Sequence, residues 1–355
     1  MHIFNYGFLQ EMFLPSQVVT LASSIARLRV LAEERRRGND AVFHSLEEIA
    51  IMESVKASNA IEGLVTTDLR IREIVNGNSA PLNQTEAEIA GYRDVLNEIH
   101  TNWSAHDFRE SDIKLFYEQM MHLANPDCRG EYKIEDNVIA ERMADGRRVV
   151  RFTPVAAADT PEAMQQLTLA YQEARDNAGI NKLLLIPCVI LDFLCIHPFA
   201  DGNGRISRLL SLLLLYRNGY DAGKYISFEE RINNRKAEYY QALRDSSADW
   251  HENACRYLPF MLNFIMTLYS CYEELDKRFA VVNSGRITKT GRIEATVLNS
   301  LTPMSKSDVC RILPDVSPTT VEAVLGAMVR NKRIRIVGSG RNTKYLRYYS
   351  NYGSN

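Results

Sequence analysis

His197-Pro-Phe-Ala-Asp-Gly-Asn-Gly-Arg-Ile-Ser-Arg208 is a polar segment between two of the most apolar stretches in this sequence of 355 residues. Eight of its twelve residues are polar or glycine, and a buried junction holds such residues only where they find hydrogen-bond partners. The flanking stretches, 182–195 and 204–217, predict two helices that are buried on all sides. An ordinary helix-loop-helix connection would explain the glycines but not the two arginines that follow them. This junction therefore calls for a functional explanation.

The junction has the composition of a phosphate-binding site. Gly202-Asn-Gly204 opens the N-terminus of a helix whose exposed N–H groups bind anions, and Arg205 and Arg208 face the same side of its first turn. Asp201 offers a hard oxygen ligand for Mg²⁺. His197 has an unperturbed pKa of about 6.5, which suits a general base. Each residue alone has an ordinary structural explanation, and their combination predicts a catalytic site.

Apolar residues recur at helical spacing through most of the remaining chain. The pattern predicts further helices over residues 16–37, 44–63, 84–101, 110–124, 161–178, 234–246 and 250–279. The exception is 137–153, where two strands flank an Asp145-Gly146 turn. A lone hairpin among helices suggests a flap. The expected fold class is therefore all-α, with a helical core and a β-hairpin flap.

The last 70 residues differ in charge from the rest of the chain. From Arg286 onward, 12 Lys and Arg stand against 4 Asp and Glu, so a net charge of +8 lies in a chain whose total is −2. Three short helices, expected over 293–301, 305–313 and 317–330, precede two strands over 334–337 and 344–348. That order of elements resembles a winged helix-turn-helix domain.

The composition favours a cytoplasmic protein. The six cysteines stand singly, without the spacing of a zinc site or the density of a disulfide scaffold. The N-terminus lacks the pattern of a signal peptide. The most apolar stretch, 183–196, is shorter than the roughly 20 residues that a membrane-spanning helix needs, so no membrane association is expected.

The segment 197–208 resembles the signature of the Fic (filamentation induced by cAMP) family, His-x-Phe-x-Asp/Glu-Gly-Asn-Gly-Arg-x-x-Arg, at every defined position. The resemblance extends over about residues 50–260 and implies AMP transfer from ATP with Mg²⁺, or Mn²⁺ as an alternative, onto a protein hydroxyl. It implies His197 as the base and Asp201 as the metal ligand. The implied nucleotide-binding residues, besides His197, are Glu62, Gly202, Asn203, Gly204, Arg205, Ile206, Ser207, Arg208, Tyr239 and Tyr240. The implied target-docking flap lies within 131–152 and includes Asn137, Val138 and Ile139.

Ser58-Asn-Ala-Ile-Glu62-Gly63 resembles the inhibitory motif of the same family, Ser/Thr-x-x-x-Glu-Gly/Asn. Ser58 and Glu62 lie on one face of a helix that ends at Gly63, which leaves Glu62 pointing outward from the helix terminus. The resemblance implies that this helix autoinhibits the enzyme within the same chain. We expect the Glu62 carboxylate to pair with Arg205 and to occupy the place of the γ-phosphate.

The expected organisation has three parts: N-terminal helices with the inhibitory helix over 1–100, the catalytic core over 101–284, and the winged-helix-like domain over 285–355. Two alternatives stay open. The same site could remove AMP, or the basic C-terminal domain could make the chain a DNA-binding regulator. The expected partners are ATP and a protein target, with DNA or protein contact through 285–355 and self-association into a homo-oligomer left open.

Overall fold

The computed structural model describes residues 2–142, 148–283, 288–298, 300, 303–313, 316–340 and 343–347. The chain forms two compact units, one of residues 1–27 and 50–271, the other of residues 28–49 and 272–355. These units differ from the three expected segments because the long helices α1, α2 and α11 each run from one unit into the other. Every residue of the expected catalytic site lies in the first unit.

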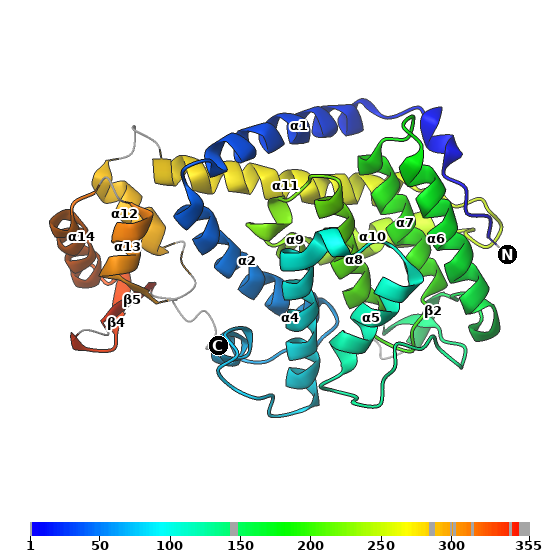
Figure 1. Ribbon diagram of the computed structural model, residues 1–355, viewed down its shortest axis with the longest axis horizontal. Coiled ribbons are helices and arrows are strands. Elements are labelled where there is room, and N and C mark those ends of the chain that lie inside the picture. The colour runs from blue at the N-terminus through cyan, green and yellow to red at the C-terminus, as the bar shows by residue number, and fades with distance from the viewer. Residues whose placement is uncertain are drawn as a thin grey trace. The chain divides into compact units, whose positions relative to one another are not determined.

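Helices account for most of the described residues (Figure 1). They are α1 (Ser16–Arg36), α2 (Asp40–Ile61), α3 (Asp68–Val75), α4 (Gln84–Asn102), α5 (Glu110–Met121), α6 (Thr160–Asp176), α7 (Lys182–Ile196), α8 (Asn203–Arg217), α9 (Phe228–Asn234), α10 (Lys236–Ser247), α11 (Leu258–Asn283), α12 (Lys289–Leu298), α13 (Lys306–Ile312) and α14 (Pro318–Arg330). Short 3-10 turns cover Gly7–Gln10, Trp103–Ala105, Ala157–Asp159 and Ala222–Lys224. The strands are β1 (Ile139–Arg142), β2 (Arg148–Phe152), β3 (Met304–Ser305), β4 (Ile334–Val337) and β5 (Lys344–Arg347). The all-α core expected from the sequence is confirmed.

The helices expected at 84–101, 110–124, 161–178, 182–195 and 204–217 are confirmed to within a few residues. The expectation of one helix from Trp250 onward is wrong, since α11 begins only at Leu258. Asp249 and Asn253 adopt positive φ angles of 55° and 58°, a left-handed conformation that interrupts a helix.

The centre of the first unit is the helix pair α7 and α8. Residues 183–196 of α7 are all buried, because that sequence is apolar on nearly every face. Residues 205–216 of α8 are buried as well, although Arg205 and Arg208 lie among them. Helices α4, α5, α6 and α10 contact this pair (Figure 1). The loop 197–202 connects the two buried helices, so both of its ends are fixed by the core.

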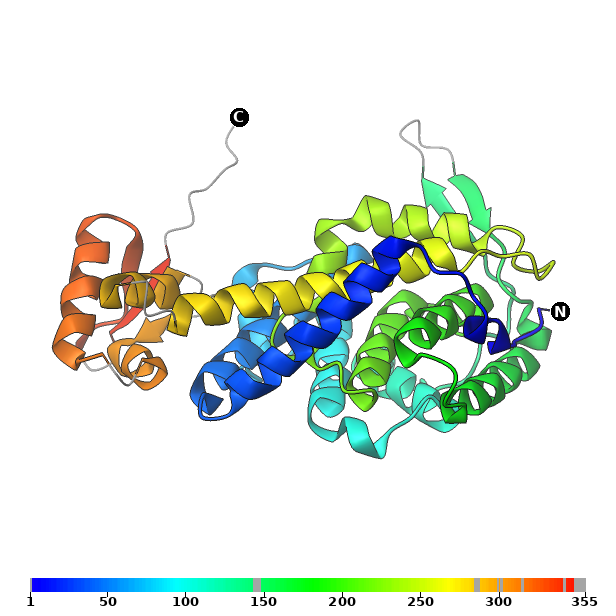
Figure 2. The same cartoon turned by 90° about the horizontal axis from the view of Figure 1, so that it is seen from above.

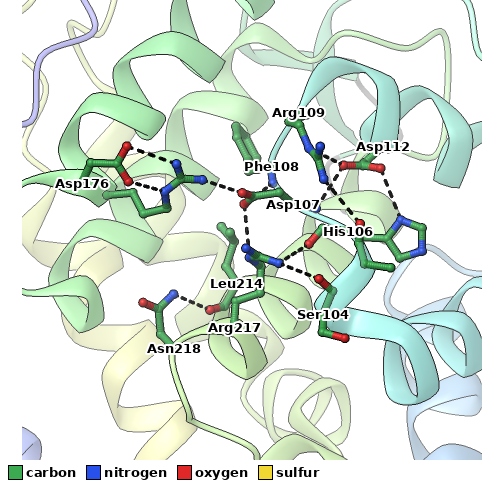
Figure 3. A network of polar contacts seen from close by, with 12 residues as sticks. Ser104, His106, Asp107, Phe108, Arg109, Asp112, Asp176, Leu214, Arg217 and Asn218 are labelled. Carbon is green, nitrogen blue, oxygen red and sulfur yellow. Dashed lines mark hydrogen bonds and ion pairs between the residues drawn. The ribbon is translucent and has the colours of Figure 1, made fainter.

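The far end of α8 is fixed by an ion-pair network (Figure 3). Arg217, in the last turn of α8, donates to the backbone oxygens of His106 at 2.5 Å and Ser104 at 3.3 Å. The Asp107 carboxylate lies 3.3 Å from Arg217 and 2.5 Å from Arg175 of α6. The network holds the C-terminal end of α8 against α6 and the loop before α5. The loop 197–202 therefore leads into a helix whose far end is fixed.

The N-terminal segment is attached to α7 through a buried carboxylate. Asp192 accepts hydrogen bonds from Tyr6 at 2.7 Å, from the Trp250 indole at 2.8 Å and from Tyr257 at 3.0 Å. Burial raises the pKa of Asp192 to about 7, and these three hydrogen bonds act in the opposite direction. The packing of residues 2–6 therefore depends on a titratable group inside α7.

Strands β1 and β2 form an antiparallel hairpin with an irregularity between Ile139 and Ala140. Figure 2 shows this hairpin projecting from the helices. At its base, the Phe152 ring stacks on His251 with centroids 5.5 Å apart. The Asp145-Gly146 turn expected from the sequence lies outside the described residues.

The second unit contains a three-stranded antiparallel sheet in the order β3-β5-β4. Ser305 begins α13 with a capping box to Asp308, and Ser317 caps α14 by accepting from Thr320 N–H at 3.2 Å. Three helices and the β4-β5 pair thus follow the expected order, and β3 is a two-residue strand that the sequence did not indicate. Among the described residues, no helix has the length and apolar character required to cross a bilayer.

Candidate active site

The loop between α7 and α8 is held in shape by its own residues. His197 ends α7 in the left-handed conformation with φ 53°, and Gly202 precedes α8 with φ 76°. The Asn203 side chain accepts from Phe199 N–H at 2.9 Å and donates to the Phe199 oxygen at 2.8 Å. The Phe199 ring is buried and stacks on Tyr117 with centroids 3.8 Å apart. Phe199 therefore anchors the loop, and the Asn203 amide shapes it.

His197 has the tautomer of a general base. Its Nδ1 lies 3.2 Å from the Leu194 carbonyl oxygen, which can only accept, so Nδ1 carries the proton and Nε2 keeps its lone pair. Burial lowers the pKa of His197 to about 4, with Lys133 acting in the same direction and the Leu194 carbonyl, Glu62 and Asp201 opposing. The imidazole is thus neutral near pH 7 and able to take up a proton.

The N-terminus of α8 provides the anion site. The first N–H groups of a helix have no intrahelical partner, and Gly202 and Gly204 leave them open to a ligand. A Cβ on Gly204 would lie 2.3 Å from Glu62 Oε1, so the carboxylate approaches the backbone where a side chain would not fit. An acidic group already occupies the place that suits a phosphate.

The segment Ser58–Gly63 lies beside α8, but the arginine that Glu62 contacts is not the expected one. Glu62 Oε1 accepts from Arg208 Nη2 at 2.8 Å, and Arg208 Nε donates to Ser58 Oγ, also at 2.8 Å. The expected pairing of Glu62 with Arg205 is wrong. The register of α2 against α8 places Glu62 one helical turn further along α8, beside Arg208. Gly63, two residues after the end of α2, adopts φ 83° and so allows the chain to turn away.

Arg205 pairs instead with Glu88 of α4. The distance between Arg205 Nη2 and Glu88 Oε2 is 2.7 Å, and the side chains are 1% and 12% exposed, respectively. Asp201 Oδ2 lies 3.9 Å from the same nitrogen. Arg205 Nε and Nη1 are buried and make no hydrogen bond with any described residue. This arginine therefore has donors to spare beside the phosphate site.

The Asp201 carboxylate is suited to hold Mg²⁺ together with the phosphates of a nucleotide. Its side chain is 81% exposed at the edge of the loop. No cluster of three His, Cys, Asp or Glu side chains that could hold a metal occurs within the described part of the chain. Mg²⁺ is typically held by one or two carboxylates together with substrate phosphates and water. A single exposed carboxylate beside an anion site fits that ion.

The base of the β1-β2 hairpin is hydrogen-bonded to the loop that carries His197. Lys133 N–H donates to the Pro198 oxygen at 2.8 Å, and its ammonium donates to the Ile196 oxygen at 3.1 Å and to Asn137 Oδ1 at 2.9 Å. Asn137 Nδ2 donates to the Phe199 oxygen at 3.3 Å. Burial lowers the pKa of Lys133 to about 8. The flap and the His197 loop are thus held in one arrangement.

Of the other residues expected to bind the nucleotide or the target, some are buried and some are exposed. Ile206 and Ser207 are buried, and Ser207 Oγ donates to the Gly204 oxygen at 2.8 Å. Tyr239 is also buried, and burial raises its pKa. Its ring lies 5.4 Å from that of the partly exposed Tyr240. Val138 is 43% exposed on the flap. Tyr240 and Val138 therefore remain accessible to ligands, whereas Ile206 serves the core.

Sequence reasoning missed Glu88 and Lys133. Glu88 lies in an amphipathic helix that carries several other acids, and Lys133 lies in an irregular segment. Their roles depend on contacts across 117 and 63 positions of sequence, which no local spacing encodes. For Glu88 the only signal was the presence of two arginines that needed partners, and for Lys133 there was none.

A model of the Fic/DOC family matches residues 107–215, which include the whole loop. A Fido domain-containing protein of Dictyostelium discoideum is 31% identical over 96 residues, covering 25% of this chain and 67% of that protein. The crystal structure of a Fic family protein from Desulfovibrio desulfuricans G20 is 19% identical, covers 97% of this chain and 99% of that one, and superposes with a TM-score of 0.61. A Fic domain-containing signaling protein from Bacteroides thetaiotaomicron is 20% identical over 75% of this chain and 100% of its own, with a TM-score of 0.60.

A helical core with the loop His197–Arg208 at its centre defines the class of protein, and the sequence relatives agree with it. The chain belongs to the Fic/DOC family. The solved structures support the same fold at low sequence identity. Proteins with Fic domains generally act as transferases of the AMPylation type.

Proposed function

We propose that the protein transfers AMP from ATP to a Ser, Thr or Tyr hydroxyl of a protein, itself included, and that Glu62 autoinhibits this reaction. The observation that carries the proposal is the arrangement of one loop. A neutral histidine base, an exposed carboxylate and an open helix N-terminus with two arginines lie within twelve residues. Such a set matches the needs of nucleotidyl transfer.

The reaction follows from what these residues can do. Nε2 of His197 takes the proton from the target hydroxyl, and the resulting oxygen nucleophile attacks the α-phosphorus of ATP. A bond forms between that oxygen and the α-phosphorus, while the bond from the α-phosphorus to the oxygen shared with the β-phosphate breaks. Pyrophosphate leaves with the electron pair. The N–H groups of the first turn of α8 stabilise the negative charge on the phosphates.

Asp201 would hold Mg²⁺, or Mn²⁺, which neutralises charge on the phosphates when bound. The adenine would lie on the side of Tyr240, whose ring stays partly exposed next to Tyr239. The flap hairpin has two strands and therefore a free edge on each, to which an extended target segment could pair. Because Lys133 and Asn137 attach the flap base to the loop, this pairing would set the position of the target hydroxyl relative to His197.

Glu62 accounts for inhibition through charge and position. Its carboxylate engages Arg208, which is 2% exposed and also bound to Ser58. A phosphate of ATP would need the same arginine and the same space above Gly204. The nucleotide therefore binds weakly, or with its phosphates turned away from the line of attack.

The test uses the Glu62→Gly variant with ATP labelled at either the α- or the γ-phosphate. AMP transfer predicts protein-bound label from the α-phosphate only. Label from the γ-phosphate only would mean phosphorylation. Loss of AMP from a premodified target, without labelling in the forward direction, would mean that the site removes AMP.

The DNA-binding alternative receives little support from α14. The face that this helix exposes carries Thr319, Glu322 and Ala323, with Arg330 as its one exposed basic residue in the last turn, and Glu322 pairs with Lys306. Major-groove recognition helices usually present Arg, Lys, Asn or Gln to the base edges. We infer that any contact made through 285–355 is with backbone phosphates or with a protein. Affinity for a DNA duplex that falls steeply with salt would identify the former.

A further inference from the structure

We propose that Glu88 is a positioning residue for the cation site, because it holds Arg205 away from Asp201. The inference rests on the proposed function and assigns a role to an acid outside the signature loop. Glu88 Oε2 lies 2.7 Å from Arg205 Nη2, whereas Asp201 Oδ2 lies 3.9 Å from the same atom. Two carboxylates thus face one guanidinium nitrogen, and the nearer one engages it.

Burial makes this competition matter. The Arg205 side chain is 1% exposed, so its charge needs a carboxylate partner, and its Nε and Nη1 groups have none among the described residues. Glu88 lies within the 19-residue helix α4, which fixes its carboxylate against α8. Asp201 lies on the loop and is 81% exposed. While Glu88 neutralises Arg205, the Asp201 carboxylate stays turned to solvent and available to a cation.

Loss of the Glu88 charge removes that arrangement. The nearest remaining carboxylate for Arg205 is Asp201, which needs to move by only about 1 Å to come within hydrogen-bond distance. Asp201 would then lose the freedom to bind the cation. Glu62 cannot substitute for Glu88, because its carboxylate is engaged by Arg208.

The experiment measures Mn²⁺ binding by electron paramagnetic resonance, with a non-hydrolysable ATP analogue present. The parent protein is Glu62→Gly, and the comparison is Glu62→Gly with Glu88→Gln. We expect Glu88→Gln to weaken Mn²⁺ binding roughly tenfold to a hundredfold, as is common for residues that orient a metal ligand. Glu88→Asp keeps the charge and should restore at least part of the affinity. Asp94→Asn, an exposed change on the same helix, is the matched control and should have no effect.

A second comparison separates positioning from general damage. Asp201→Asn should weaken Mn²⁺ binding strongly in the parent and only slightly when Glu88→Gln is already present, since both changes remove the same carboxylate from the cation. Equal Mn²⁺ affinity in the parent and the Glu88→Gln variant would overturn the inference. Fully additive losses of Mn²⁺ affinity from Asp201→Asn and Glu88→Gln would overturn it as well. If Mn²⁺ binding responds as expected but no AMP is transferred, the proposed function fails while the role of Glu88 stands.

Discussion

Replacing Glu62 with glycine should release the enzyme, and the structure gives the size of the effect. The carboxylate lies 2.8 Å from Arg208 Nη2, directly over Gly204. A phosphate oxygen bound to the first turn of α8 would lie about 4 Å from it, where like charges repel by about 4 kcal/mol at an effective dielectric constant of 20. Because 32% of the Glu62 side chain is exposed, water screens part of this repulsion. We therefore expect the rate to rise about 10²-fold rather than the roughly 10³-fold that 4 kcal/mol would give.

The assay follows incorporation of α-labelled ATP into the purified protein at a fixed ATP concentration. Glu62→Gln keeps the size of the side chain and removes its charge, so it should recover most of the gain. Glu48→Gln, an exposed change on the same helix, should recover none. Adding Arg208→Ala to Glu62→Gly should remove the gain, because the arginine that Glu62 releases is then missing. A Glu62→Gly protein that binds ATP and labels itself no faster than the unaltered chain would refute the reasoning.

Further predictions concern the base, the flap and the buried acid. His197→Ala should lower transfer about 10²-fold or more while ATP still binds. Because the pKa of His197 is about 4, kcat/KM with the histidine present should show no change around pH 6.5, and a pH profile with its midpoint near 6.5 would contradict this. Lys133→Met removes the ammonium that attaches the flap base to the loop, so it should reduce transfer to a protein target while nucleotide affinity stays the same. An equal loss of transfer and of nucleotide affinity would indicate misfolding. Folding favours protonated Asp192, with a pKa of about 7 against 3.8 when unfolded, so its contribution to stability falls as pH rises between these values. The melting temperature of Asp192→Asn, taken relative to that of the unaltered protein, should therefore be higher at pH 8 than at pH 5. The same difference in melting temperature at both pH values would count against a protonated Asp192.

The sequence was sufficient for features that depend on local order. The loop His197–Arg208, the start of α8 within one residue of the expected Gly204 and the cap at Ser317 each follow from residues a few positions apart. The end of α2 near Gly63 follows in the same way, because glycine alone adopts its φ of 83° without strain. Short elements were missed: α3 and α9, at 8 and 7 residues, span too few turns for a period to be recognised.

Partners across the fold could not be predicted. Glu62 and Arg208 are 146 positions apart, and only the packing of α2 against α8 decides which arginine the glutamate meets. We expected Arg205 from the sequence, but both arginines lie on the same side of one helical turn, so local spacing does not distinguish them. In the structure, Glu88 already engages Arg205. The identity of each pair is thus a property of tertiary packing.

The proposed reaction moves an AMP unit rather than a phosphate, with His197 as the base and Glu62 as the inhibitory group. Intact mass spectrometry of the Glu62→Gly protein after incubation with ATP and Mg²⁺ tests it most directly. We expect a mass gain of one AMP unit per modified hydroxyl, absent when His197→Ala is added and much smaller when Glu62 is retained. A gain equal to one phosphate, or an AMP gain that persists without His197, would contradict it.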